Sequence, residues 1–192
     1  MKRTEALEIV KEQLKLSRYE HTIRVTDTAV DLAKYYEQPI DKIEIAAILH
    51  DYAKYRDKAE MSRWIETSNL SKDLLQYHSE LWHGPVGALL VKFEVGIEDP
   101  IILEAIHCHT TGKAHMNMVE KIIFLADYIE PGRDFPGVEA VRIQAKQDLD
   151  YACLLALKNT IDHLVIQEQL VYPDALHAYN DLLRKRKIKL GE

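Results

Sequence analysis

The segment AAILHDYAK, residues 46–54, places a histidine and an aspartate side by side within an apolar, helix-forming stretch. Burying an imidazole and a carboxylate is unfavourable unless each is paired with the other, with a counter-charge or with a metal ion. Because neighbouring helical residues point about 100° apart, His50 and Asp51 cannot clamp an ion by themselves. The segment therefore predicts a buried helix that borders a site to which other helices contribute.

The composition predicts an all-α fold. The chain has 192 residues, of which 47% are hydrophobic, so it is long enough to bury a sizeable core. Only seven Gly and six Pro are present, which leaves little room for hairpin turns, and residues that favour helix dominate. We expect one domain over residues 1–192, with a motif-bearing core at about 17–135 and a C-terminal helical annex at about 137–192.

The sequence favours a soluble protein of the cytoplasm. It lacks a run of about 18 apolar residues, and its amphipathic start MKRTEALEIVKEQL lacks the apolar block of a signal peptide. Cys108 and Cys153 form no CxxC pair, so both are interpreted as small core residues in a reducing compartment. A net charge of −6 without a long basic stripe argues against nucleic acid as a partner, and no segment indicates a membrane partner.

Capping residues predict where the helices begin. Ser17 is expected to cap a helix over residues 18–37. Asp41 and Glu44 resemble a capping box at the start of the next helix, which is expected to carry His50 and Asp51 within it. Further helices are predicted after Asp99 at Pro100, after Asn117 with Glu120, at about 148–169, and at about 173–189.

Six candidate metal ligands lie on or at the ends of five predicted helices, where a helical bundle can bring them together. Imidazoles and carboxylates without cysteine suit iron, manganese or zinc in a catalytic site. Six ligands are too many for one ion that must also hold water and substrate, so we expect two ions, bridged by the two oxygens of Asp51. The candidates are His21, His50, Asp51, His83, His109 and Asp127.

The other histidines and two basic residues need separate interpretation. His107 precedes His109 by two residues and so faces another side of the helix; we leave it out of the site. Lys54 and Arg133 border the carboxylate-bearing segments, which favours phosphate binding, although solvated surface charge is the ordinary role of such residues. The remaining histidines are interpreted as ordinary core or surface residues: His78, His115, His163 and His177.

Five motifs in order resemble one known family. They are RYEHTIRV, HDYAK, WHGPVGA, HTTG and ADYIEPGR, and together they span residues 18–133. The set resembles the HD-domain phosphohydrolase superfamily, and within it the YqeK-like branch, the bacterial symmetrical diadenosine tetraphosphate hydrolases. The resemblance implies an all-α bundle, a dinuclear metal centre that often contains iron, and hydrolysis of dinucleoside polyphosphates into two nucleoside diphosphates.

The resemblance also implies which residues hold each ion. The first metal would be bound by His21, His50, Asp51 and Asp127, and the second by Asp51, His83 and His109. Manganese, zinc or another divalent ion could replace iron at such ligands. The C-terminal helices carry no motif of the family, so the resemblance assigns them no role.

The expected reaction is attack of a metal-bridging hydroxide on a phosphorus of diadenosine tetraphosphate, which releases two ADP. Asp51, Lys54 and Arg133 are the expected catalytic side chains. Two alternatives stay open: another HD phosphohydrolase activity, on nucleotides or cyclic dinucleotides, and a non-catalytic nucleotide-binding regulator. The oligomeric state is also open and includes a homodimer. The expected substrate contacts are Lys54, Gly84, Thr110, Thr111 and Arg133.

Overall fold

In the computed structural model, which describes residues 1–191, the chain consists mainly of helices. Within this range there are ten α-helices and no β-strand, which confirms the predicted all-α fold. Two short 3₁₀ segments and one π-helical turn complete the helical elements: η1 (Lys72–Gln76), η2 (Ser79–Leu81) and η3 (Val91–Val95). The α-helices are α1 (Arg3–Gln13), α2 (Leu16–Tyr35), α3 (Ile40–Leu49), α4 (Lys58–Thr67), α5 (His83–Leu90), α6 (Pro100–Cys108), α7 (Met118–Ile129), α8 (Val138–Gln144), α9 (Leu149–Ile166) and α10 (Pro173–Leu190).

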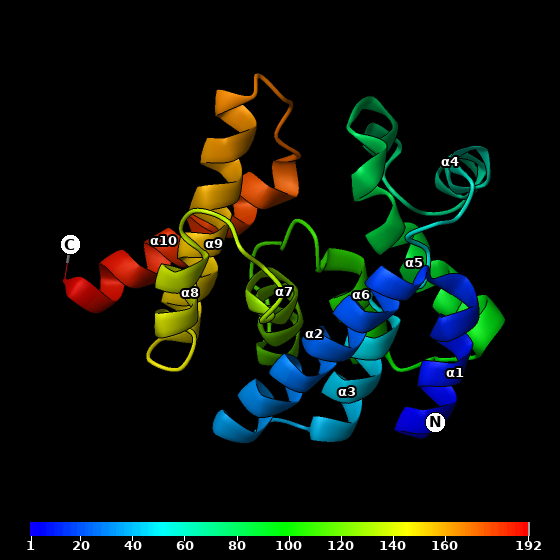
Figure 1. Cartoon of the computed structure of the whole chain (residues 1–192). Helices are drawn as coiled ribbons and strands as arrows, with labels where there is room; N and C mark the ends of the chain where they lie inside the picture. The colour runs from blue at the N-terminus through cyan, green and yellow to red at the C-terminus, as the bar shows by residue number, and fades with distance from the viewer. Residues whose placement is uncertain (192) are drawn as a thin grey trace.

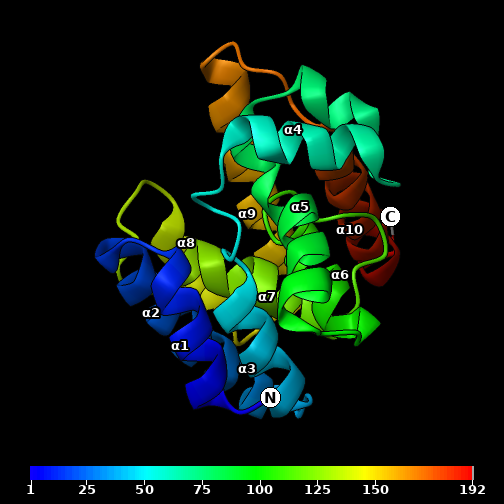
Figure 2. The same ribbon diagram turned by 90° about the vertical axis from the view of Figure 1, so that its right-hand side faces the viewer.

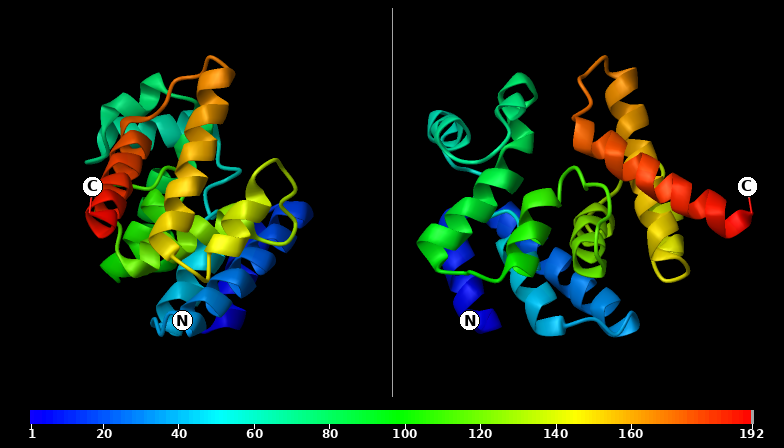
Figure 3. Two further views of the ribbon diagram at one scale, coloured as in Figure 1. Left: turned by 90° about the vertical axis from the view of Figure 1, so that its left-hand side faces the viewer. Right: turned by 180° about the vertical axis from the view of Figure 1, so that it is seen from behind.

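Helices α2, α3, α5, α6 and α7 form the centre of the molecule. α2 packs on α3 and α7, and α6 packs on α3, α5 and α7. The C-terminal helices α8–α10 lie on the opposite side of this centre from α1 and α4 (Figures 1 and 3). α9 packs directly on α7, and α8 and α10 both pack on α9. The central helices therefore have a helical layer at each side.

Helix α7 is buried on almost every face, because α2, α6 and α9 pack around it. Every residue from Val119 to Ala126 is buried. The predicted capping box holds its start, since Glu120 N donates to Asn117 Oδ1 at 3.0 Å and Asn117 N donates to Glu120 Oε2 at 2.9 Å. Asp99 likewise caps α6, as predicted, by accepting from the amide of Ile101 at 2.9 Å.

Two predicted helix starts are wrong. α2 begins one residue before Ser17, so this serine lies within the helix and does not cap it. α3 begins directly after Pro39, whose fixed φ directs the chain into the helix, and no side chain caps it. The Glu44 carboxylate, predicted to complete a capping box, instead accepts from Arg3 Nη1 at 2.9 Å.

Arg3 also explains the position of α1. Its other guanidinium nitrogen lies 2.8 Å from Asp27 Oδ1, so one side chain joins α1 to both α2 and α3. The apolar side of α1 is buried through Ala6 and Val10. Figure 2 shows α1 lying along α2 and α3. The first helix therefore braces the central helices.

No helix among residues 1–191 combines the length and the hydropathy needed to cross a membrane.

The helix that was predicted to contain His50 and Asp51 ends just before them. α3 stops at Leu49, and the chain continues through a turn in which Tyr52 N donates to Leu49 O at 3.0 Å. His50 Nδ1 lies 2.6 Å from Ala47 O, the carbonyl that would otherwise accept the Asp51 amide in a continuing helix. The His50 side chain thus occupies the carbonyl oxygen that the next helical amide would use. As a result, both residues sit at a helix terminus.

The C-terminal helices also differ from expectation at their ends. α9 is shorter than the predicted helix over 148–169, because residues after Ile166 turn away. The separate short helix α8 was not predicted. The last helix follows the prediction closely and ends at Leu190.

Candidate metal centre

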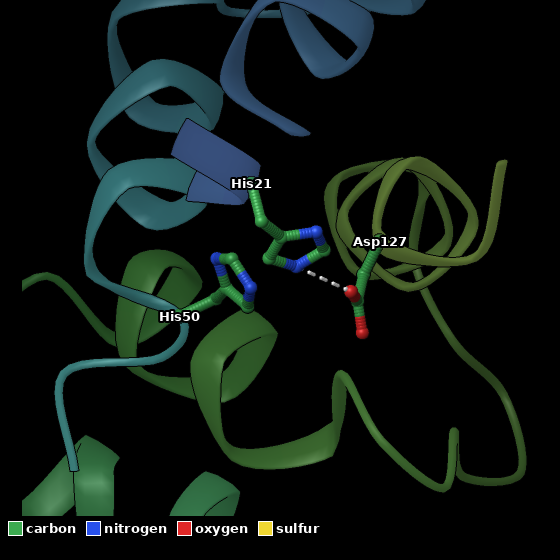
Figure 4. Close-up of side chains that lie close together, drawn as sticks. All are labelled: His21, His50 and Asp127. Carbon is green, nitrogen blue, oxygen red and sulfur yellow. Dashed lines mark ion pairs between the residues drawn. The ribbon is translucent and has the colours of Figure 1, made fainter. Parts of the chain in front are cut away.

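The six predicted ligands converge between the central helices. His21 projects from α2, His50 and Asp51 from the end of α3, His83 from the start of α5, His109 from the end of α6, and Asp127 from α7. All except Asp127 are at most 5% exposed. Figure 4 shows three of them facing one another from separate helices.

The four imidazoles are oriented in the same way. Each has its Nδ1 next to an oxygen that can only accept a hydrogen bond, so Nδ1 carries a proton, and in the neutral ring that a metal binds the lone pair is on Nε2. A fixed outer nitrogen of this kind is usual for metal-binding histidines. The Nδ1 contacts are His50 to Ala47 O at 2.6 Å, His83 to Glu80 O at 2.6 Å, His109 to Ile106 O at 2.7 Å, and His21 to Glu130 Oε1 at 3.0 Å.

The Nε2 atoms point into a common space. His83 Nε2 lies 3.1 Å from His109 Nε2, a contact in which two lone pairs face each other when Nδ1 carries each proton. The buried Nε2 atoms of His21 and His50 make no hydrogen bond of good geometry within residues 1–191, although Asp127 Oδ1 lies 3.0 Å from the first and Asp51 Oδ2 lies 3.1 Å from the second. Buried polar atoms of this kind require a partner. Converging lone pairs without donors between them therefore fit a bound cation.

The donor atoms form two groups. His21, His50 and Asp127 make one group of donors within 4.8 Å of one another, and His50, Asp51 and His109 make the other. His21 Nε2 lies 3.0 Å from Asp127 Oδ1 in the first group. The groups share His50, so they lie next to each other.

The two oxygens of Asp51 face different histidines. Its Oδ1 lies 3.2 Å from His83 Nε2, while its Oδ2 lies 3.1 Å from His50 Nε2 and 3.8 Å from His21 Nε2. This is the arrangement that a bridging carboxylate requires. Burial opposes ionisation of Asp51, but His50 and His83 hold its pKa well below the usual value. Burial, together with His83 and His50, lowers the pKa of His109 to about 3, which keeps that ring neutral and able to bind a metal.

Glu130 is a buried residue that the sequence analysis missed. Its carboxylate accepts from His21 Nδ1 at 3.0 Å, from Arg24 Nε at 2.6 Å and from the Gly132 amide at 2.5 Å. Burial raises the pKa of Glu130, but the hydrogen bonds from Arg24 and His21 outweigh it and bring the pKa to about 2. The available signal was its position in ADYIEPGR, next to the Pro-Gly pair that follows α7.

Replacing Glu130 by glutamine is expected to weaken metal retention by roughly 10- to 100-fold, the usual effect of losing an outer hydrogen-bond partner of a metal ligand. The amide can still accept from His21 but no longer carries the charge that makes the imidazole a stronger ligand. Competition with a chelator measures retention directly. The matched control is Glu139→Gln, an exposed position on α8 that pairs only with Arg142 at 3.1 Å. Equal retention in both variants would contradict the assigned role.

Arg18 is the second residue that was missed. Its Nη1 lies 3.0 Å from Asp51 Oδ2, one helical turn before His21. Together with Arg24 and Arg133 it lines a cavity of about 320 Å³ beside the donor groups, here called the cationic cavity. Its place in RYEHTIRV, three residues before a candidate ligand, was the available signal. Positive charge thus lies directly next to the centre.

The two basic residues predicted to contact phosphate are anchored to ligand-bearing segments. Arg133 Nη2 lies 2.7 Å from Asp127 Oδ1, and Arg133 Nε donates to the Asp127 carbonyl at 2.9 Å. Lys54 Nζ lies 2.9 Å from Glu80 Oε2. The same Glu80 supplies the carbonyl that orients His83. Their contacts with substrate stay predictions.

Gly84 and the two threonines differ in what surrounds them. Gly84 is buried where α5 meets α6, and a Cβ there would lie 2.8 Å from His107 O, so the glycine permits close helix packing. Thr110 Oγ1 is buried and has no hydrogen-bond partner in the described part of the chain, whereas Thr111 Oγ1 donates to Gly112 O at 2.9 Å. His107 belongs to neither donor group. The predicted substrate contacts of Gly84, Thr110 and Thr111 stay predictions.

The helical architecture and the donor set define an all-helical protein with a buried histidine–aspartate centre, and the comparisons identify its family. The family described as HD domain matches residues 18–132, more than half of the chain, so the protein belongs to the HD domain family. The matched range contains all six candidate ligands together with Arg18 and Glu130.

Several proteins are similar over nearly the whole length. The chain is 54% identical over 187 residues to a Halalkalibacterium halodurans protein named bis(5'-nucleosyl)-tetraphosphatase, symmetrical, which covers 97% of this chain and 100% of that protein. A Bacillus subtilis protein of the same name is 48% identical over 183 residues, covering 95% and 98%. The crystal structure of a Clostridium acetobutylicum protein, described as a predicted HD superfamily hydrolase involved in NAD metabolism, is 35% identical, with a TM-score of 0.91 and coverage of 96% and 98%.

Proposed function

We propose that this protein is a metal-dependent hydrolase that cleaves diadenosine tetraphosphate symmetrically into two ADP. The observation that carries the proposal is full-length similarity, at 54% identity, to a protein named symmetrical bis(5'-nucleosyl)-tetraphosphatase. The buried donor groups supply the chemistry that such a reaction needs. The other HD phosphohydrolase activities would use the same centre, so the products decide between them.

The proposed metal ligands are those that the family resemblance implies, and the donor groups support most of them. His21, His50, Asp51 and Asp127 would bind the first ion, and Asp51, His83 and His109 the second. Iron is the proposed metal, and manganese or zinc suits the same nitrogen and oxygen donors. When bound, the two ions lower the pKa of water for attack on phosphorus and neutralise charge on the phosphate oxygens.

The side chains around the centre would bind and orient the phosphate chain. Arg133 and Arg18 present guanidinium groups that can donate two parallel hydrogen bonds to a phosphate. Lys54 adds a positive charge near His83. The unpartnered Thr110 Oγ1 can donate to a phosphate oxygen once substrate is present. Electrostatic positioning by these fixed groups is the main contribution that a protein makes to phosphoryl transfer.

Hydrolysis in oxygen-18 water tests the proposal. Symmetric cleavage should give two ADP, with the label on the terminal phosphate of one ADP from each substrate molecule. Water that attacks an inner phosphorus and breaks the central P–O–P bridge expels ADP and leaves a labelled ADP, whereas breaking an outer P–O–P bridge gives ATP and AMP. Mass spectrometry of the initial products separates these outcomes, and the Asp51→Ala protein is the matched control for contaminating activity.

Three outcomes would reject the assignment. ATP and AMP as initial products would mean that an outer bridge of the phosphate chain is cleaved in place of the central one. Preferential cleavage of a mononucleotide or a cyclic dinucleotide would move the protein to another HD phosphohydrolase activity. Tight binding of nucleotide without turnover by the metal-loaded protein would instead support the non-catalytic alternative.

A further inference from the structure

Three cavities adjoin one another, and Thr160 of α9 lines each of them. The central cavity, of about 200 Å³, is lined by His109, Asp127 and Arg133 and so lies at the candidate metal centre. The first outer cavity, of about 530 Å³, shares Thr110 and Thr160 with it. The second outer cavity, of about 650 Å³, shares Tyr128, Phe135 and Thr160 with it. Each outer cavity therefore borders the place where the phosphates would react.

The two outer cavities have similar chemistry. Each exposes mainly apolar surface and has one carboxamide side chain, Gln169 in the first and Asn159 in the second, together with ionisable side chains, His78 and Glu80 in the first and Asp162 and His163 in the second. Their volumes lie within the roughly 300–1,000 Å³ of small-molecule sites, which combine apolar walls with a few polar groups. The first is walled by Leu81, Leu164, Leu170 and Tyr172, and the second by Tyr128, Phe135, Pro136 and Ile166.

We propose that each outer cavity holds one nucleoside of the dinucleoside polyphosphate, and that the phosphate chain crosses the central cavity between them. This inference rests on the proposed function. The substrate has two identical nucleoside ends joined by a polyanion, which matches two largely apolar cavities that adjoin the candidate metal centre. A carboxamide can donate to and accept from an adenine edge, and aromatic walls provide faces for the base.

The proposal gives a physical reason for symmetric cleavage. Two nucleosides held on either side of the same centre place the middle of the phosphate chain over it, so attack at an inner phosphorus follows from the position of the cavities. It also gives α9 a function, because Thr160 of this helix lines all three cavities. The central helices would supply the reaction, and the C-terminal helices would supply base recognition.

The cationic cavity is a poorer place for a nucleoside. Its lining includes Arg18, Arg24, Arg133 and Glu130, and Tyr55 is its aromatic member. Charged side chains favour phosphate over a base, because burying a base against them leaves the charges less solvated. The competing arrangement places the second nucleoside in the cationic cavity, and substitutions in the two outer cavities separate the two arrangements.

Three exposed apolar residues near the end of α9 allow a matched test. Leu170 lines the first outer cavity and Ile166 the second, whereas Val165 lines neither; their exposures are 66%, 76% and 61%. Each is replaced by serine, which removes apolar contact at a surface position. Leu170→Ser and Ile166→Ser should each raise KM for diadenosine tetraphosphate about five- to tenfold with kcat within about twofold. Val165→Ser should leave both unchanged.

Inhibition by ADP adds a signature of two equivalent cavities. ADP has one nucleoside and can occupy either cavity, so a single variant should raise its inhibition constant only about twofold, the loss of one of two equal sites. The double variant should raise this constant about tenfold. For diadenosine tetraphosphate, which needs both cavities, the KM effects of the two single variants should multiply. Circular dichroism melting checks that all variants are folded.

The possible failures are distinguishable. Wild-type protein without activity on diadenosine tetraphosphate would reject the proposed function itself. An active wild type in which neither variant changes KM would overturn the nucleoside cavities alone. An effect of Leu170→Ser but not of Ile166→Ser, with equal changes for ADP and the tetraphosphate, would overturn the second cavity and place that nucleoside elsewhere.

Discussion

Replacing Asp51 by alanine is expected to lower kcat by about 10³-fold or more, because groups that stabilise developing charge in a reaction centre have effects of this size. Asp51 is the one candidate ligand whose two oxygens face different histidines, His83 on one side and His50 on the other. Its loss would therefore affect both cation positions. Steady-state kinetics with the metal-reconstituted variant measure the effect.

Two neighbouring variants serve as comparison and control. His109→Ala should mainly weaken the second ion and leave the first group, His21, His50 and Asp127, intact. His107→Ala should have little effect on turnover, since its ring belongs to neither donor group. If His107→Ala lowered kcat as much as His109→Ala does, the assignment of ligands at the end of α6 would be wrong. Melting curves separate loss of catalysis from loss of folding.

Purified protein is expected to carry close to two transition-metal ions per chain, and a chelator should abolish its activity. Six candidate ligands, with Asp51 facing His50 through one oxygen and His83 through the other, are the reason for the count. Added iron or manganese should restore turnover. Elemental analysis of the same sample that is assayed gives the count, and His109→Ala is expected to retain only about one ion.

Metal removal should also lower the melting temperature. A ligand that binds only the folded state stabilises it by about 2.7 kcal/mol at 100 times its dissociation constant. A chelator removes the metal from the histidine nitrogens, so the folded protein would lose this stabilisation. Full activity in a sample free of bound metal would disprove the metal centre. Full activity with zinc alone would identify zinc as the metal and leave the assignment of the site unchanged.

The outer partners of the centre illustrate what local patterns miss. Glu130 was not predicted, because its contact with His21 joins residues 109 positions apart. Arg18 was overlooked since a basic residue on a helix surface is ordinarily solvated, yet here the packing of α2 on α3 brings it to Asp51. Neither contact leaves a periodic signal, because each depends on the placement of two helices.

The sequence by itself determined the helical elements that local interactions control. The capping box of Asn117 and Glu120, the Asp99 cap and the apolar periodicity act within about one helical turn, so α6 and α7 could be predicted. The identity of the candidate ligands was also accessible, because motif spacing and the scarcity of buried histidine–aspartate pairs single them out. Where α3 ends was less accessible, since the His50 side chain competes for the Ala47 carbonyl.

Only the tertiary structure decided how these residues face one another. The direction of each Nε2 depends on which oxygen holds the opposite ring nitrogen, and for His21 that oxygen comes from Glu130 on another segment. Gly84 illustrates the same dependence, because its need for a missing Cβ appears only where α5 meets the His107 carbonyl. The cavities around Thr160 likewise require α9 to pack on α7. Long-range packing of the core sets these positions, and no pattern within a few residues encodes them.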